Sequence, residues 1–231
     1  MAKKGKLIVI DGIDGSGKAT QTKLLATRLK QAGYKIKTID FPRYYDNFFG
    51  GLIGEYLSGQ YGDFTKVDPR IASVLYAADR FESSIQIKKW LEEGYIVLAD
   101  RYVSANQIHQ GGKIKNLKQR EEFMIWLNKM EFNVFKLPKP DLVIFLDVPY
   151  EISKKWLQGK VNQMSKKYLK GKKDVAEDNL RHLKLSRDSA LLLAQKNKNW
   201  SKIECCKGSI CMSPPEVSKN VFKIVSKRLK I

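Results

Sequence analysis

The chain has 231 residues, of which 43% are hydrophobic, and it carries a formal net charge of +19. This length and apolar content fit one folded domain over residues 1–231 and exclude wholesale disorder. No apolar run approaches the ~20 residues of a membrane helix, and only four apolar residues follow the basic start MAKKGK, so we expect a cytoplasmic protein with no membrane partner.

The first predicted elements are a buried strand over residues 7–10 and a glycine-rich turn after it. Gly12, Gly17 and Lys18 match the phosphate-binding pattern G-x-x-x-x-G-K-[ST], except that Ala19 replaces the hydroxyl residue. A helical pattern follows. Backbone N–H groups hold phosphate in a strand, glycine turn and helix of this kind, so the sequence predicts a nucleotide site here.

The later elements alternate between strands and helices. Apolar, β-branched runs predict further strands at 35–41, 95–99, 142–147 and 203–206. Helices are predicted at 68–93, in a short segment after the fourth strand, at 117–135, and after Ser213, which begins an S-x-x-E capping box. This alternation indicates an α/β fold with a mostly parallel five-stranded sheet and helices on both faces.

Charged residues follow the predicted strands, where the ligands of an open parallel sheet bind. Asp11 ends the first strand, Arg43 follows the second and Asp147 ends the fourth, while Asp100-Arg101 follows the third. The planar fork of arginine suits phosphate oxygens. Two arginines beside a phosphate loop therefore predict a second anionic group opposite the first, as in an enzyme that transfers a phosphoryl group between two substrates.

Three cysteines lie close together near the last strand: Cys205, Cys206 and Cys211. Their spacing is not that of a metal site, and no histidine lies near them in the sequence. We expect reduced thiols on or near a strand.

Together these residues resemble the thymidylate kinase family. The matching stretches follow the family's order from about residue 8 to residue 185: DGIDGSGKATQ, FPRY, YGDF, LYAADRFE, ADRYVSANQIHQG, MEFNVFKLPKPD and KKDVAEDN. FPRY together with AADRFE and DRY is specific, whereas a glycine loop alone is not. The resemblance implies a P-loop nucleoside-monophosphate-kinase fold with a lid segment, in which Mg²⁺ assists transfer of the γ-phosphoryl of ATP to dTMP.

The resemblance also implies roles for individual residues. The ATP phosphates would lie on Gly12, Ile13, Asp14, Gly15, Ser16, Gly17, Lys18, Ala19 and Thr20. The dTMP site would contain Phe41, Arg43, Tyr44, Tyr76, Arg80, Arg101, Asn106, His109 and Gln110. Within it, Arg43 and Arg101 would bind the dTMP phosphate, Tyr76 would stack on thymine, and Arg80 would donate to the thymine carbonyl. Lys18, Asp14, Arg101 and Asp100 would be catalytic, and the two aspartates would also contact the metal.

Three places depart from the family's pattern, and at one of them Ala105-Asn106 stands where the family more often has two serines. Ala19 offers no hydroxyl to magnesium, and Thr20 cannot replace it because one residue turns about 100° around a helix. Since Mg²⁺ keeps several waters and needs one or two protein ligands, Asp14 and Asp100 suffice and the site is weakened rather than lost. His109 stands where the family usually has tyrosine, near the 2′ side of the sugar, and we assign it no acid or base role.

A lysine-rich stretch is expected to form the lid over ATP at about residues 158–175. The family brings an extra cation to the transferred phosphoryl from the loop or from the lid. Neither segment of this chain contains arginine, so we expect a lysine to act, with Lys166, Lys167 and Lys170 as the first choices. For the other lysines a solvated basic loop is the simpler interpretation.

Three other functions compete with this interpretation. A GTP-switch protein would need N-K-x-D after a strand, but residues 128–131 read NKME inside a predicted helix. A nucleic-acid-binding module would explain the charge but not FPRY, AADRFE or DRY. A kinase of another nucleoside monophosphate stays open. We expect no specific nucleic-acid partner, and family resemblance alone suggests a homodimer through the helix that begins at Asp68.

Overall fold

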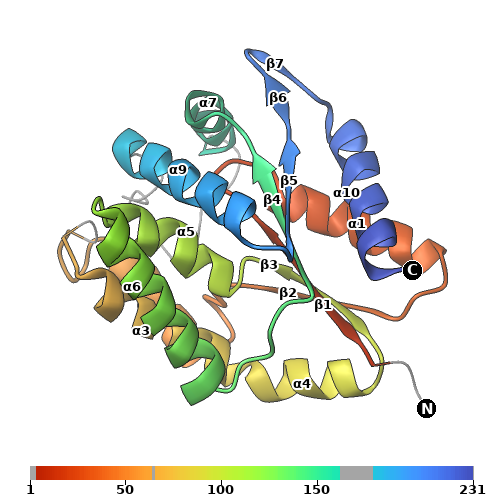
Figure 1. The fold of residues 1–231 in the computed structure, drawn as a ribbon, viewed down its shortest axis with the longest axis horizontal. Coiled ribbons are helices and arrows are strands. Elements are labelled where there is room, and N and C mark those ends of the chain that lie inside the picture. The colour runs from red at the N-terminus through yellow and green to blue at the C-terminus, as the bar shows by residue number, and fades with distance from the viewer. Residues whose placement is uncertain (1–3, 64–65, 162–178, 231) are drawn as a thin grey trace.

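The computed structural model describes residues 4–63, 66–161 and 179–230, without the side chains of residues 159–161. Its central feature is a five-stranded parallel sheet in the order β2-β3-β1-β4-β5, seen nearly along its edge in Figure 1. The strands are β1 (Lys6–Asp11), β2 (Ile36–Asp40), β3 (Ile96–Asp100), β4 (Leu142–Asp147) and β5 (Trp200–Glu204). The predicted sheet is confirmed.

Helices cover both faces of this sheet, as predicted (Figure 1). Ile8 and Ile10 of β1 face one way and pack with α1 (Lys18–Gln31) and α10 (Pro214–Leu229). The alternate residues of β1 face the other way, toward α4 (Ser84–Glu92), α5 (Val103–Lys113) and α9 (Leu180–Lys196). Successive strand residues point to opposite faces, so the apolar run Leu7–Ile10 of β1 packs into two cores and fixes the loop that follows the strand.

The helix predicted over residues 68–93 is wrong in its length. The structure has α3 (Pro69–Glu82) and α4, with Ser83 between them. Ser83 Oγ accepts from Asn47 Nδ2 at 3.1 Å, so a residue from before α2 (Phe48–Leu57) contacts the break. The predicted N-cap is confirmed, because Asp68 accepts from the backbone N–H of Arg70 at 2.7 Å.

Two other boundaries also differ from the prediction. The helix predicted over 117–135 is α6 (Leu117–Asn128) followed by a π-helical turn (Lys129–Val134). The last sheet strand begins at Trp200 rather than at residue 203, because Trp200 and Ile203 are its buried positions.

The short helix after the fourth strand is α7 (Tyr150–Val161), and the capping box at Ser213 is present at the start of α10.

The prediction of three reduced cysteines is wrong. β6 (Cys206–Lys207) and β7 (Ile210–Cys211) form a small antiparallel hairpin in which Cys206 lies directly opposite Cys211, and a disulfide joins them. Cys205 is a free, buried thiol. Among the described residues, none of the helices has the length and apolar character needed to cross a bilayer.

Candidate functional site

The glycine-rich turn between β1 and α1 has the backbone geometry of a phosphate loop. Gly15 and Gly17 have φ angles of 80° and 87°, in the region that favours glycine. A Cβ atom on Gly12 would lie 2.5 Å from Ser16 Oγ, so the loop is tight there as well. The α1 helix begins at Lys18, which places its N-terminal N–H groups at the loop.

Lys18 lies folded against this loop. Its Nζ donates to the carbonyl oxygen of Ile13 at 2.9 Å, and the side chain is almost fully buried. Burial and the nearby charge of Arg101 lower the pKa of Lys18. A bound phosphate would offer this ammonium a stronger partner than a neutral carbonyl does.

Arg101 ties the end of β3 to the phosphate loop. Its Nη2 donates to the Asp14 carboxylate, and its Nη1 lies 3.8 Å from Asp11 Oδ1. Arg101 has a φ angle of 65°, which is uncommon for a residue with a side chain and occurs at functional sites. Burial alone would raise the pKa of Asp14, but the charges of Arg101 and Lys18 outweigh it and hold that pKa below its usual value.

The carboxylates at the ends of β1 and β3 differ in their surroundings. Asp11 is fully buried and accepts from Ser104 Oγ at 2.6 Å and from the backbone N–H of Gly12 at 2.8 Å. Asp100 is half-buried, and burial raises its pKa. The described residues contain no cluster of three or more His, Cys, Asp or Glu side chains that could hold a metal. Magnesium here would therefore depend on one or two carboxylates and on substrate phosphates.

His109 bonds the same arginine from the next helix. Because Arg101 Nη1 can only donate, the histidine Nε2, at 2.8 Å, must accept. Nδ1 then carries the proton and donates to Ser186 Oγ at 3.2 Å. His109 also stacks on His182, with ring centroids 5.4 Å apart. The sequence pattern did not identify Ser186 or His182, because both lie on α9, more than 70 residues away.

Arg43 is held by side chains from three segments. Its Nη2 donates to Asp46 Oδ2 at 2.9 Å and its Nη1 to Ser83 Oγ at 3.4 Å, while its backbone N–H donates to Asp79 Oδ2 at 3.2 Å. Nε is buried and has no hydrogen-bond partner among the described residues. Phe41, before a cis peptide bond to proline, is buried against Tyr102 and belongs to the core rather than to an open surface.

Arg80 lies in a fully buried network that includes a residue the sequence did not single out. Its Nε donates to Glu131 Oε2 at 2.9 Å, and its Nη2 donates to Glu131 Oε1. Asn106 Nδ2 donates to the same Oε1 at 2.9 Å. Glu131 lies on the π-helical turn, and only the tertiary fold brings it to α3.

The remaining predicted substrate residues lie around this network. Tyr76 is half-buried and stands one helical turn before Arg80, so the two share a face of α3. Gln110 stands one turn after Asn106 on α5, and its buried Oε1 has no donor among the described residues. Tyr44 is half-buried near the start of α2. The predicted lid residues Lys166, Lys167 and Lys170 lie outside the described residues.

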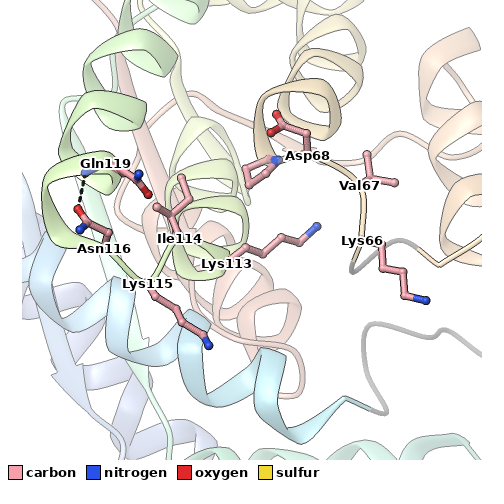
Figure 2. Close-up of a pocket in the computed structure, with 9 residues that line it drawn as sticks. Lys66, Val67, Asp68, Lys113, Ile114, Lys115, Asn116 and Gln119 are labelled. Carbon is pink, nitrogen blue, oxygen red and sulfur yellow. Dashed lines mark hydrogen bonds between the residues drawn. The ribbon is translucent and has the colours of Figure 1, made fainter.

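A hollow of about 620 Å³ lies between the segment before α3 and the end of α5 (Figure 2). Lys66, Lys113 and Lys115 line it together with Asp68, and burial lowers the pKa of Lys113 to about 8. A second hollow, of about 450 Å³, lies beside the π-helical turn. None of the predicted site residues lines either hollow, so side-chain contacts rather than cavity size define the candidate site.

Several known proteins are similar to this chain in sequence. The family model described as thymidylate kinase matches residues 10–204. The chain is 30% identical to the thymidylate kinase of Mycobacterium tuberculosis over 158 residues, which are 68% of this chain and 72% of that protein. It is 32% identical to human thymidylate kinase over 148 residues, 64% of this chain and 63% of that protein.

The fold is also similar to the solved structure of Candida albicans thymidylate kinase. The two superpose with a TM-score of 0.73 and 23% identity, over 99% of this chain and 94% of that one. At this identity the likeness concerns the fold alone.

Proposed function

The chain belongs to the thymidylate kinase family, and we propose that it transfers the γ-phosphoryl of ATP to dTMP, giving dTDP and ADP. One observation carries this proposal: Arg101, at the end of β3, is joined to Asp14 of the phosphate loop that follows β1. The two strands are neighbours in the sheet. A cation for the acceptor phosphate therefore stands beside the loop for the donor phosphates.

The donor side of the reaction depends on the loop and on Lys18. Backbone N–H groups at the start of α1 bind the phosphates of ATP, and Lys18 leaves the Ile13 carbonyl to follow the charge that develops on the transferred group. In phosphoryl transfer the protein contributes mostly positioning and electrostatic stabilisation. The loop supplies that positioning because the buried strand β1 before it and α1 after it hold it in place.

The acceptor side depends on arginines held in place by other residues. Asp14 and His109 hold the Arg101 guanidinium from two directions. Arg43 has a buried Nε without a partner, and a dTMP phosphate supplies one. Asp46 is exposed, so the Arg43 head group can leave it for the phosphate at little cost.

The proposed site offers magnesium few protein ligands. Asp100 and Asp14 are the carboxylates that would hold it, directly or through water, and Ala19 contributes nothing. The ion would neutralise charge on the phosphate oxygens during transfer. We further propose that one lid lysine, among Lys166, Lys167 and Lys170, supplies an extra cation. Single-turnover rates of alanine variants at these positions test it, with a tenfold or larger fall in kcat expected for one of them.

We also propose that the protein is a homodimer. Large apolar side chains are exposed along α3 and α4, at Ile71, Val74, Phe81 and Ile85, and Ile125 of neighbouring α6 is exposed as well. Such a surface is typical of an interface. Sedimentation of the wild-type chain and of Ile71→Lys tests this, because a buried charge at the interface should shift the dimer to monomers.

Two further expectations concern the protein's surroundings. We propose that it has no specific nucleic-acid partner, so that any retention on DNA should be independent of sequence and fall steeply with salt. We propose that it acts in the cytoplasm. A disulfide between Cys206 and Cys211 is unusual in that compartment, and thiol trapping of the protein taken from cells measures its state there.

The proposed activity is tested by product analysis. The chain is incubated with ATP, Mg²⁺ and dTMP, and the nucleotides are separated; dTDP and ADP should appear in equal amounts. Lys18→Ala is the control, because it removes the phosphate-loop cation. ADP without dTDP would indicate a hydrolase instead.

A further inference from the structure

The buried carboxylate of Glu131 is the unexpected feature of the predicted base pocket. It is fully buried and accepts three hydrogen bonds, two from the Arg80 guanidinium and one from the Asn106 amide. These partners come from α3 and α5, while Glu131 comes from a π-helical turn. A π-helical turn is rare and is often associated with function. A carboxylate would not remain buried in such a place without paired charges.

The contacts of Asn106 fix which way its amide points. Nδ2 donates to the backbone oxygen of Ser73 at 3.1 Å and to Glu131 Oε1 at 2.9 Å. Both partners are acceptors, so the nitrogen must face them and both of its protons are used. The amide oxygen then points away from Glu131, and both side-chain hydrogen bonds of Asn106 to described residues are made by Nδ2. Asn106 is thereby held as an acceptor.

The contacts of Arg80 leave its guanidinium as a hydrogen-bond donor. Nε and Nη2 bond Glu131, and Nη1 donates to the Tyr102 backbone oxygen at 3.3 Å. A guanidinium has five N–H groups, so two remain, and they can only donate. The carboxylate also balances the charge of Arg80, which leaves a donor pair that does not require an anion.

We propose that Glu131 is a positioning residue that sets the hydrogen-bond polarity of the base pocket, with Asn106 as acceptor and Arg80 as donor. This inference rests on the proposed function. Thymine and uracil present a carbonyl oxygen beside an N–H, which matches a donor beside an acceptor. Cytosine presents an amino group beside a bare ring nitrogen, which is the reverse pattern. Glu131 therefore selects dTMP over dCMP without touching the base.

The experiment measures kcat/KM for dTMP, dUMP and dCMP in the wild-type chain and in Glu131→Gln. A glutamine can donate toward Asn106, which allows that amide to turn and offer its N–H groups to the base. We expect the dTMP-to-dCMP ratio to fall at least tenfold, mainly through KM. The dTMP-to-dUMP ratio should not change, because thymine and uracil present the same edge.

Leu127→Ala is the matched control for loss of stability. Leu127 is fully buried one turn before Glu131 on the same helical segment, and it makes no polar contact. This change should lower stability but leave the base ratios as they are. A uniform loss of activity with all three nucleotides in Glu131→Gln, equal to that in Leu127→Ala, would show a purely structural role and overturn the proposal.

A second variant keeps the test decisive if Glu131→Gln does not fold. Glu131→Asp retains the charge but is one methylene shorter, so it cannot reach both Asn106 and Arg80; the dTMP-to-dCMP ratio should lie between those of wild type and glutamine. An unchanged ratio in folded Glu131→Asp contradicts the proposal. Calorimetry without ATP measures the affinities for dTMP and dCMP, and the ratio of these affinities should rank wild type, Glu131→Asp and Glu131→Gln in the same order. If the wild-type chain does not phosphorylate dTMP at all, the proposed function fails, which is distinct from an active enzyme whose base ratio ignores Glu131.

Discussion

The Nη2 group of Arg101 donates to the Asp14 carboxylate, so the end of β3 is joined to the phosphate loop that follows β1. His109 Nε2 accepts from the other terminal nitrogen of the same guanidinium at 2.8 Å. A planar fork is needed to reach both partners at once. Asp14 and His109 thus set the orientation of the Arg101 guanidinium before any ligand binds.

Arg101→Lys should separate charge from geometry. Lysine keeps the positive charge but lacks the fork, so it can hold one partner and not both. We expect kcat/KM for dTMP to fall roughly ten- to a hundredfold, as for loss of an oriented group that stabilises developing charge. A steady-state titration of dTMP measures this. Wild-type efficiency in Arg101→Lys would show that charge alone matters.

Arg80→Ala should lower both stability and dTMP use. Removing one partner of a buried ion pair leaves the Glu131 charge unpaired, which costs about 3–5 kcal/mol. In a chain of this size that lowers the melting temperature by about 10 °C. The loss of the proposed donor to the base should lower kcat/KM for dTMP roughly ten- to a hundredfold.

The double variant Arg80→Met with Glu131→Leu distinguishes these two effects. Apolar side chains of similar volume often replace a buried ion pair without loss of stability. The melting temperature should return toward that of wild type while dTMP use stays low. Recovery of activity along with stability would mean that Arg80 acts on the fold alone.

Stability should fall in mild acid because His182 is buried. Burial lowers the pKa of His182 to about 4, against the ordinary value of 6.5, although the charge of Asp14 opposes this. The unfolded chain therefore binds the proton first, and the contribution of His182 is full above pH 6.5 and is lost as the pH falls toward 4. The change is about 3 kcal/mol. Denaturant unfolding of wild type and His182→Phe should diverge over this interval, and parallel pH curves would contradict it.

Ala19→Ser should lower the magnesium concentration for half-maximal rate. Ala19 is exposed in the first turn of α1, so a serine can be placed there without disturbing the core. In the proposed magnesium site, its hydroxyl would add a neutral ligand to the carboxylates and the substrate phosphates. Titration of Mg²⁺ at fixed ATP measures the change. An unchanged midpoint would indicate a metal site that is already complete.

The sequence predicted those features that depend on local spacing. The glycine turn at Gly12 to Lys18 and the strands that end at Asp100 and Asp147 follow from short apolar runs and from residues next to them in the chain. The caps at Asp68 and Ser213 depend on contacts within three residues and were predicted for the same reason.

The features that were missed depend on contacts between distant residues. Glu131 reaches Arg80 across 51 positions, through a π-helical turn that no apolar period reveals. The break at Ser83 involves Asn47, 36 positions away. The disulfide needs a hairpin that sets Cys206 opposite Cys211, and the spacing of the cysteines does not indicate that hairpin.

The central claim is that this chain is a kinase for dTMP, and a substrate panel tests it most directly. Coupled ADP release with ATP and Mg²⁺ is measured for dTMP, dUMP, dCMP, dAMP and dGMP, in the presence and absence of DNA. We predict the highest kcat/KM for dTMP, with DNA having no effect. A higher kcat/KM for a purine monophosphate or dCMP, or ADP release that depends on DNA, would contradict the account.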